Sequence, residues 1–193
     1  MAEQKIILAS ASPRRRDLLQ QIGLTFTIDS ADVNETVLPG EAPEPYAVRV
    51  ALDKARVTAA KTRSGIVIAA DTIVVLDDLI LGKPADSGEA GRMLSLLSGR
   101  RHSVITGLAV MDALSGMTRS AMSVTSVWFR QLSQSEIRSY VLSGEPLDKA
   151  GAYGIQEKGA LLVDRIEGCY FNVVGLPLSL LGKMLPEFGV PLF

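Results

Sequence analysis

The strongest strand signal in the chain, residues 66–76, has one carboxylate near its middle. The segment reads Ile-Val-Ile-Ala-Ala-Asp-Thr-Ile-Val-Val-Leu, so apolar residues flank Asp71 on both sides. Such a run predicts a central strand that is buried on both faces of a sheet. An unpaired carboxylate in that position is strongly destabilising, so Asp71 requires a metal ion, cationic partners or a proton. The alternative is a structural Asp71 that caps a turn or ends the strand.

A second unusual stretch places three arginines at the start of a predicted helix. Ile6–Leu8 is typical of a short buried strand. Ser12 is a typical N-cap residue, and Pro13 suits the first turn of a helix. Arg14–Arg16 follow directly. The helix dipole disfavours cations at this end and favours anions. An anion held by both the backbone N–H groups and the arginines explains the pattern, and phosphate is the commonest such anion. The alternative is a solvated basic turn.

The bulk composition limits the classes of function. With 193 residues, 47% of them hydrophobic, the chain suffices for one domain over residues 1–193, with room for two lobes. The formal net charge of −1 disfavours binding to a long nucleic acid. A single cysteine, Cys169, and a single histidine, His102, exclude a disulfide framework and a multi-histidine metal site. A metal ion would therefore be a hard cation on oxygen ligands, such as Mg²⁺ or Mn²⁺.

The chain also shows neither a signal peptide nor an apolar run of membrane-spanning length. We therefore expect a cytoplasmic protein that does not bind to membranes.

Periodicity and turn residues predict an alternation of strands and helices. The segments expected to be extended are Thr25–Asp29, Leu79–Leu81, His102–Met111, Thr118–Arg130 and Leu161–Ile166. Helices are expected at 45–62, after Asp86 with Glu89 in a capping pair, after Ser133 with Glu136 in a capping box, and after Pro177. An acidic, turn-rich loop fills residues 32–45.

The helix at 45–62 has an apolar stripe with one lysine beside it. The stripe is formed by Val48, Ala51, Leu52, Ala55 and Ala59, and the polar residues Arg49, Asp53 and Arg56 point away from it. Lys54 lies on its flank, where it could reach a cleft or extend its amine to solvent.

The stretch 145–156 is too glycine-rich for a helix interior and too polar for a core. Gly151 and Gly154 would allow close backbone approach, and Gln156 offers a donor and an acceptor. This composition suits a ligand-binding loop, although a plain connector fits as well. His102, the lone histidine, is expected to be structural.

Six ordered motifs then indicate a family. They are Ser-x-Ser-Pro-Arg-Arg at 10–15, Ala-Asp-Thr at 70–72, Gly-Lys-Pro at 82–84, His-x-Val-x-Thr-Gly at 102–107, Asp-Lys-Ala-Gly-x-Tyr-x-Ile-Gln at 148–156 and Asn-Val-Val-Gly-Leu-Pro at 172–177. Together they resemble the Maf family of nucleoside triphosphate pyrophosphatases. The resemblance implies a mixed α/β fold like that of inosine triphosphate pyrophosphatase (Maf/Ham1). That fold has a long twisted mixed sheet, flanking helices and two lobes around a cleft, and the family is usually homodimeric.

The resemblance also assigns roles around a triphosphate. It implies that phosphate is held by Ser10, Arg14, Arg15, Lys54 and Lys83. It implies that Glu35 and Asp71 bind the divalent cation, Mg²⁺ or Mn²⁺, and that Asp71 is the proton acceptor of the reaction. Thr72 and Gln156 would lie near the base, and Arg14 would also influence specificity.

The residues of the 148–156 motif resemble those of the family branch that hydrolyses dTTP and UTP. The expected products are a nucleoside monophosphate and pyrophosphate. Two alternatives stay open at this point. The substrate could be 7-methyl-GTP or inosine triphosphate, or the chain could be a non-catalytic nucleotide-binding regulator of cell division.

Overall fold

The computed structural model describes residues 4–192, which form two compact units. The first comprises residues 4–71, 106–123 and 175–192, and the second comprises 72–105 and 124–174. Three strands, β3 (Ile66–Leu76), β5 (Arg101–Asp112) and β6 (Thr118–Phe129), contribute residues to both units. The prediction of a single domain over residues 1–193 stays a prediction.

The strands form a mixed sheet in the order β2-β1-β3-β5-β6-β7. In it, β1 (Ile6–Leu8) pairs in parallel with β2 (Thr27–Ile28) and with β3. Two other strands pair antiparallel, β4 (Leu79–Leu81) with β3 and β7 (Val163–Glu167) with β6. The neighbouring strands β5 and β6 are joined by a short turn, so the predicted long hairpin is confirmed.

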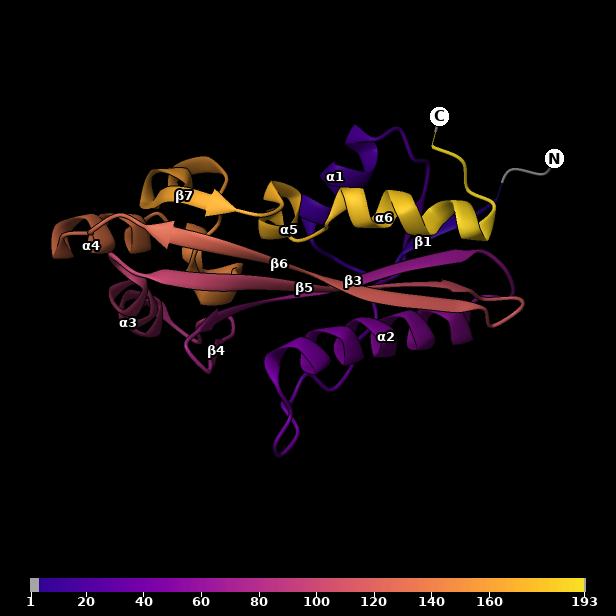
Figure 1. The fold of residues 1–193 in the computed structure, drawn as a ribbon, viewed down its shortest axis with the longest axis horizontal. Helices are drawn as coiled ribbons and strands as arrows, with labels where there is room; N and C mark the ends of the chain where they lie inside the picture. Colours follow the sequence, from indigo (N-terminus) through magenta and orange to yellow (C-terminus); the bar gives the residue numbers. More distant parts are fainter. Residues whose placement is uncertain (1–3, 193) are drawn as a thin grey trace. The chain divides into compact units, whose positions relative to one another are not determined.

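In the first unit, helices cover both faces of the sheet (Figure 1). The helix α2 (Pro43–Lys61) lies on one face, and α1 (Pro13–Gln21) and α6 (Leu178–Met184) lie on the other. A cluster of small and β-branched residues fills the α2 interface: Ile7, Ala9, Ala51, Ala55, Val67, Ala69 and Ala109. At Gly107 on β5 a Cβ atom would overlap the Ala47 carbonyl of α2. The backbone of α2 is thus in direct contact with the sheet, and its inward side chains are held closely in place.

In the second unit, α3 (Ser87–Leu97) packs against α4 (Gln134–Leu142). Both helices begin as predicted. The Asp86 carboxylate accepts a hydrogen bond from the backbone N–H of Glu89, and Ser133 and Glu136 form a capping box. Shorter helical turns follow at Glu145–Asp148, Ala150–Ala152 and Glu157–Leu162, and then α5 at Tyr170–Val174. One further turn, Leu185–Phe188, belongs to the first unit.

The predicted orientation of α2 was wrong by part of a turn. The structure buries Tyr46, Ala47, Val50, Ala51, Lys54, Ala55 and Thr58. Lys54 therefore lies on the buried face instead of its flank. A stripe chosen by hydrophobicity alone excludes a lysine, whereas here the ammonium has a buried partner and the alkyl stem packs as an apolar group.

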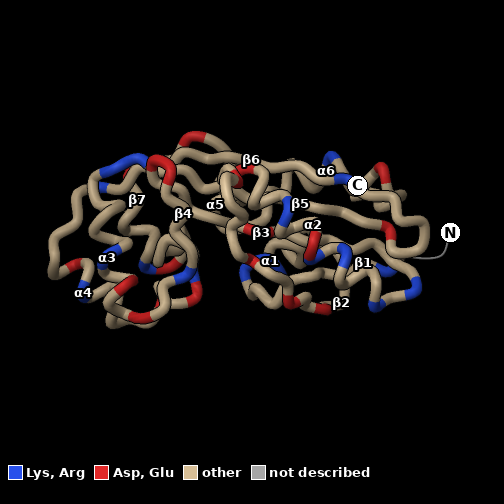
Figure 2. The backbone as a smooth tube through the Cα atoms, turned by 90° about the horizontal axis from the view of Figure 1, so that it is seen from below, with Lys and Arg blue, Asp and Glu red and all other residues tan. Residues whose placement is uncertain are grey.

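Basic and acidic positions are interspersed along the backbone of each unit (Figure 2). This distribution agrees with the formal net charge of −1. No helix within residues 4–192 is long and apolar enough to span a membrane.

Candidate active site

The carboxylate of Asp71 is buried beside an ammonium group. Side chains alternate along β3, so Asp71 shares with Val67 and Ala69 the face that α2 covers. Lys54 reaches it from α2, with Nζ 2.7 Å from Asp71 Oδ1. Asp71 is 6% exposed and Lys54 9%. The structure therefore supplies the cationic partner that the sequence required, and the turn-cap alternative is wrong.

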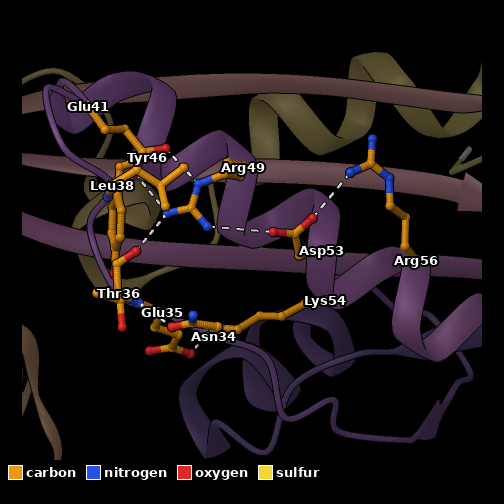
Figure 3. Close-up of polar contacts among 10 residues, drawn as sticks. All are labelled: Asn34, Glu35, Thr36, Leu38, Glu41, Tyr46, Arg49, Asp53, Lys54 and Arg56. Atoms are coloured by element: carbon orange, nitrogen blue, oxygen red, sulfur yellow. Dashed lines mark hydrogen bonds and ion pairs between the residues drawn. The ribbon is translucent and has the colours of Figure 1, made fainter.

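A second carboxylate meets the same ammonium. Glu35 lies in the loop before α2, and its Oε1 is 2.7 Å from Lys54 Nζ (Figure 3). The Glu35 side chain is 52% exposed, so this cluster opens to solvent on the Glu35 side. Two carboxylates thus converge on one cationic position, deep at Asp71 and accessible at Glu35.

This donor set fits a hard divalent cation. Mg²⁺ is commonly bound by one or two carboxylates, with substrate phosphate oxygens and waters completing the octahedron. Among the described residues no group of three or more His, Cys, Asp or Glu side chains gathers to hold a metal by itself. The arrangement suits an ion that is shared with a phosphate ligand and does not suit a closed structural metal site.

Ser10 and Arg15 lie at the carboxyl end of β1. The parallel register pairs Leu8 with Ile68, so Ser10, two residues after Leu8, lies level with Ala70, the neighbour of Asp71 on β3. Arg15 Nη1 donates to Ser10 Oγ at 3.0 Å, and Arg15 Nε donates to the Gly175 carbonyl at 2.8 Å. Gly175 has a φ of 121°, a conformation that favours glycine.

Burial lowers the pKa of Arg15, and the nearby charge of Arg14 lowers it further, while Asp71 and Glu35 raise it. The Arg15 guanidinium therefore lies within electrostatic range of both carboxylates. An anionic ligand at this place would offset the desolvation of the guanidinium.

Arg16 differs from the other two arginines of the first turn of α1. Arg14 is half-buried, whereas Arg16 is exposed and pairs with its neighbour Asp17 at 3.0 Å. The solvated-turn interpretation thus holds for Arg16 and fails for Arg15. Ser12 occupies the N-cap position, but its side chain makes no cap hydrogen bond. Its backbone N–H instead donates to Ser10 Oγ at 3.2 Å.

Three predicted site residues belong to the second unit. Thr72 follows Asp71 on β3 and is half-buried. Lys83 is exposed after β4, and Gln156 is half-buried just before the Glu157–Leu162 turn. The roles of these three residues stay predictions.

The glycines of the 148–156 motif serve packing. A Cβ at Gly151 would lie 2.8 Å from Val74, and one at Gly154 would lie 2.9 Å from the Lys149 stem. Gly151 also has a φ of 66°. The space beside these two residues is therefore filled by protein, so their lack of a side chain does not indicate a ligand.

His102 has the surroundings of a structural residue. It is 2% exposed, its Nε2 lies 2.7 Å from the Tyr153 hydroxyl, and it packs edge-on against the rings of Phe129 and Tyr153. Burial lowers the pKa of His102 to about 4. The imidazole is neutral at pH 7 and belongs to the core of the second unit.

Sequence reasoning missed the residues that hold the Glu35 loop. Tyr46 and Arg49 of α2 donate hydrogen bonds to the backbone carbonyls of Glu35 and Thr36, and Glu41 is paired with Arg49. Arg49 was interpreted as part of an outward polar face. The only available signal was an arginine and a glutamate of opposite charge eight positions apart, which no helical spacing rule connects.

Comparison with known proteins identifies the family of this chain. The sequence model of the family described as Maf-like protein matches residues 5–188. The chain belongs to the Maf family. Relatives named dTTP/UTP pyrophosphatase include the Geobacter metallireducens protein, 53% identical over 186 residues, which span 96% of each chain. Another, from Syntrophomonas wolfei, is 50% identical over 182 residues, or 94% of this chain and 96% of that one. A third, from Methanosarcina barkeri, is 50% identical over 191 residues, or 98% and 97%.

A solved structure confirms the fold of this Maf protein. The HAM1 protein from Coxiella burnetii superposes with a TM-score of 0.57 at 21% identity and covers 96% of this chain and 100% of that one. The predicted relation to the Maf/Ham1 fold is therefore confirmed.

Proposed function

We propose that this Maf protein is a nucleoside triphosphate pyrophosphatase that hydrolyses dTTP and UTP to the monophosphate and pyrophosphate. The substrate follows from relatives of that name at about half identity over nearly the whole chain. The chemistry follows from one observation above all. Asp71 and Glu35 converge on the Lys54 ammonium. Burial lowers the pKa of Arg15, and the charges of these two carboxylates partly oppose that shift, so they act on its guanidinium. Such a constellation is suited to a polyanion and a cation together.

The phosphate groups would be bound where β1 ends and α1 begins. Ser10, at the end of β1, and Arg14 and Arg15, in the first turn of α1, would bind the triphosphate, and the helix N-terminus adds its partial positive charge. Cations along the triphosphate disperse the charge that develops on the departing pyrophosphate. The Gly175 carbonyl fixes the direction of the Arg15 guanidinium before substrate arrives.

Glu35 and Asp71 would hold the divalent cation, Mg²⁺ or Mn²⁺. When bound, such an ion polarises phosphoryl oxygens and favours ionisation of water. Asp71 accepts the proton of the water that attacks the α phosphorus, because it is the buried carboxylate of the pair. Lys54 now neutralises both carboxylates, and its flexible stem would allow the ammonium to turn to a phosphate oxygen if a metal ion were bound by them.

The remaining roles are proposed on family resemblance alone. Thr72 and Gln156 would contact the base and Lys83 a phosphate oxygen, and the protein would act as a homodimer. The half-buried Gln156 has an amide that can pair with the O4 and N3–H edge of uracil and thymine.

Pyrophosphate release from a nucleotide panel tests the proposal. The panel comprises dTTP, UTP, CTP, the purine triphosphates, inosine triphosphate and 7-methyl-GTP, each with Mg²⁺, with Mn²⁺ and after chelation. We expect hydrolysis of dTTP and UTP, lost on chelation and restored by either metal. Binding of nucleotide without turnover would favour the regulator hypothesis. Preferential turnover of 7-methyl-GTP or inosine triphosphate would contradict the proposed substrate.

A further inference from the structure

Glu35 is the one member of the carboxylate–lysine cluster that no helix or strand carries. Asp71 lies on β3 and Lys54 on α2, whereas residues 29–42 have no regular secondary structure. The Glu35 side chain is also half exposed. Its carboxylate nevertheless lies 2.7 Å from Lys54 Nζ, so contacts outside the cluster must hold the loop against α2.

Two side chains one turn apart on α2 hold the backbone carbonyls of Glu35 and of the next residue, Thr36. The Tyr46 hydroxyl donates to the Glu35 carbonyl at 2.7 Å, and Arg49 Nη2 donates to the Thr36 carbonyl at 3.0 Å (Figure 3). Tyr46 is 6% exposed and therefore fixed in the core. The guanidinium carbon of Arg49 lies 5.4 Å from the centre of the Tyr46 ring. The loop is thus attached to a rigid helix at two consecutive residues.

The return of the loop is attached by a bidentate ion pair. Arg49 Nε lies 2.6 Å from Glu41 Oε1, and Nη2 lies 2.8 Å from Glu41 Oε2. Glu41 Oε2 in turn accepts the backbone N–H of Leu38 at 3.0 Å, which closes the turn. The two side chains are 24% and 10% exposed, and paired guanidinium and carboxylate planes resist rotation.

We propose that Tyr46, Arg49 and Glu41 are positioning residues that hold the Glu35 carboxylate at the cation site and thereby set the affinity of the protein for its divalent metal ion. This inference rests on the proposed function, because it takes Glu35 to be a metal ligand. A ligand on an anchored loop loses little conformational freedom on binding. The same ligand on a detached loop must be ordered by the metal itself.

The experiment compares loop variants with a control on the same helix. Arg49→Met removes the ion pair and the Thr36 contact, and Tyr46→Phe removes one hydrogen bond while keeping the ring. Arg56→Met is the matched control, since Arg56 is an α2 arginine that is 61% exposed and pairs with Asp53. Mn²⁺ alone is the probe, with its Kd measured by electron paramagnetic resonance on the full chain without nucleotide. Hydrogen exchange of residues 29–42 reports whether the loop has detached.

We expect Arg49→Met to weaken Mn²⁺ binding about tenfold or more, as for other residues that orient metal ligands. Tyr46→Phe should weaken it by a smaller factor, and Arg56→Met should match wild type. The metal concentration for half-maximal dTTP hydrolysis should rise in parallel, with a smaller change in kcat at saturating metal. Arg49→Lys should recover part of the lost affinity, because it keeps the charge without the bidentate geometry.

The two proposals fail in different ways. If Arg49→Met releases the loop in hydrogen exchange while the Mn²⁺ Kd is unchanged and wild type hydrolyses dTTP, the positioning role is wrong and the proposed function stands. If wild type neither binds Mn²⁺ nor hydrolyses dTTP, both are wrong. Should Arg49→Met prove poorly folded by circular dichroism, Tyr46→Phe and Glu41→Gln decide the question through the same Kd.

Discussion

The two units bury polar groups in opposite ways. In the first, Lys54 and Asp71 form a charged pair that is less than a tenth exposed and is extended by the half-exposed Glu35. In the second, His102 and Tyr153 form a neutral hydrogen bond among aromatic rings. Burying charges is costly even when they are paired, whereas a neutral hydrogen-bonded pair is accommodated readily.

This difference separates chemistry from stability. The charged cluster of the first unit reaches solvent through Glu35, so a metal ion or a phosphate can exchange with the existing partners. The pair in the second unit is enclosed by the apolar cluster of that unit, and it contributes to folding. We therefore expect substitutions in the first cluster to change turnover, and substitutions in the second to change the free energy of unfolding.

The largest expected effect is on Asp71. Asp71→Asn removes the proposed proton acceptor and should reduce kcat by about 10³-fold, equivalent to about 4 kcal/mol. The fold should survive, because Glu35 remains on the Lys54 ammonium. Pyrophosphate release and thermal unfolding, measured together, check both parts. Normal turnover by a folded variant would remove Asp71 from the mechanism and weaken the contrast between the units.

The arginine turn provides the second test. Arg15→Ala should lower kcat/KM, and the corresponding loss of transition-state stabilisation should be about 2–4 kcal/mol. The reason is that a charge-assisted phosphate contact and the hydrogen bond to Ser10 are lost. Arg14→Ala should act in the same range. Arg16→Ala is the control and should have a small effect, since Arg16 is exposed and pairs with Asp17. Equal effects at all three positions would support a solvated basic turn.

The third test concerns the pH dependence of folding. The folded pKa of His102, about 4, lies below its unfolded value of 6.5, so the unfolded chain binds more protons between these values. The contribution of neutral His102 is complete above pH 6.5 and is lost as the pH falls toward 4. For one buried histidine the loss between pH 7.5 and pH 5 is about 2 kcal/mol.

Urea unfolding at pH 7.5, 6 and 5 measures this slope. In His102→Gln the part of the slope due to the histidine should disappear, while kcat at pH 7.5 stays close to that of wild type. A pH slope that is the same in both proteins, or a large loss of kcat in the variant, would contradict a purely structural role.

Local rules predicted most of the fold and part of the site. The apolar run at 66–76, the Asp86 N-cap and the Ser133–Glu136 capping box act over neighbouring residues, so β3 and the starts of α3 and α4 could be predicted directly. Asp71 was recognisable because a lone carboxylate in a buried strand conflicts with its surroundings. The burial of Lys54 and the anchoring of the Glu35 loop by Arg49 depend on tertiary pairing. Helical periodicity therefore placed Lys54 beside the buried face instead of on it, and it could not reveal the loop contacts of Arg49.

The smallest expected effect is at Gln156, which is an exception to the expected contrast between turnover in the first unit and stability in the second. Gln156 belongs to the second unit, yet family resemblance gives it the base of the substrate. Wild type should prefer dTTP and UTP over CTP and purine triphosphates by at least about tenfold in kcat/KM, or about 1.4 kcal/mol. The reason is that an amide can pair with a carbonyl beside an N–H, whereas cytosine presents an amino group and an unprotonated nitrogen.

Gln156→Glu replaces the amide donor with an acceptor and should reduce this preference more than it lowers kcat, because the change lies at the base and not at the phosphorus. The measurement is kcat/KM for each common triphosphate and for 7-methyl-GTP, on wild type and variant. An unchanged preference in Gln156→Glu would leave the second unit with a structural role only at this position, and a loss of kcat without a change in preference would place Gln156 with the reacting groups.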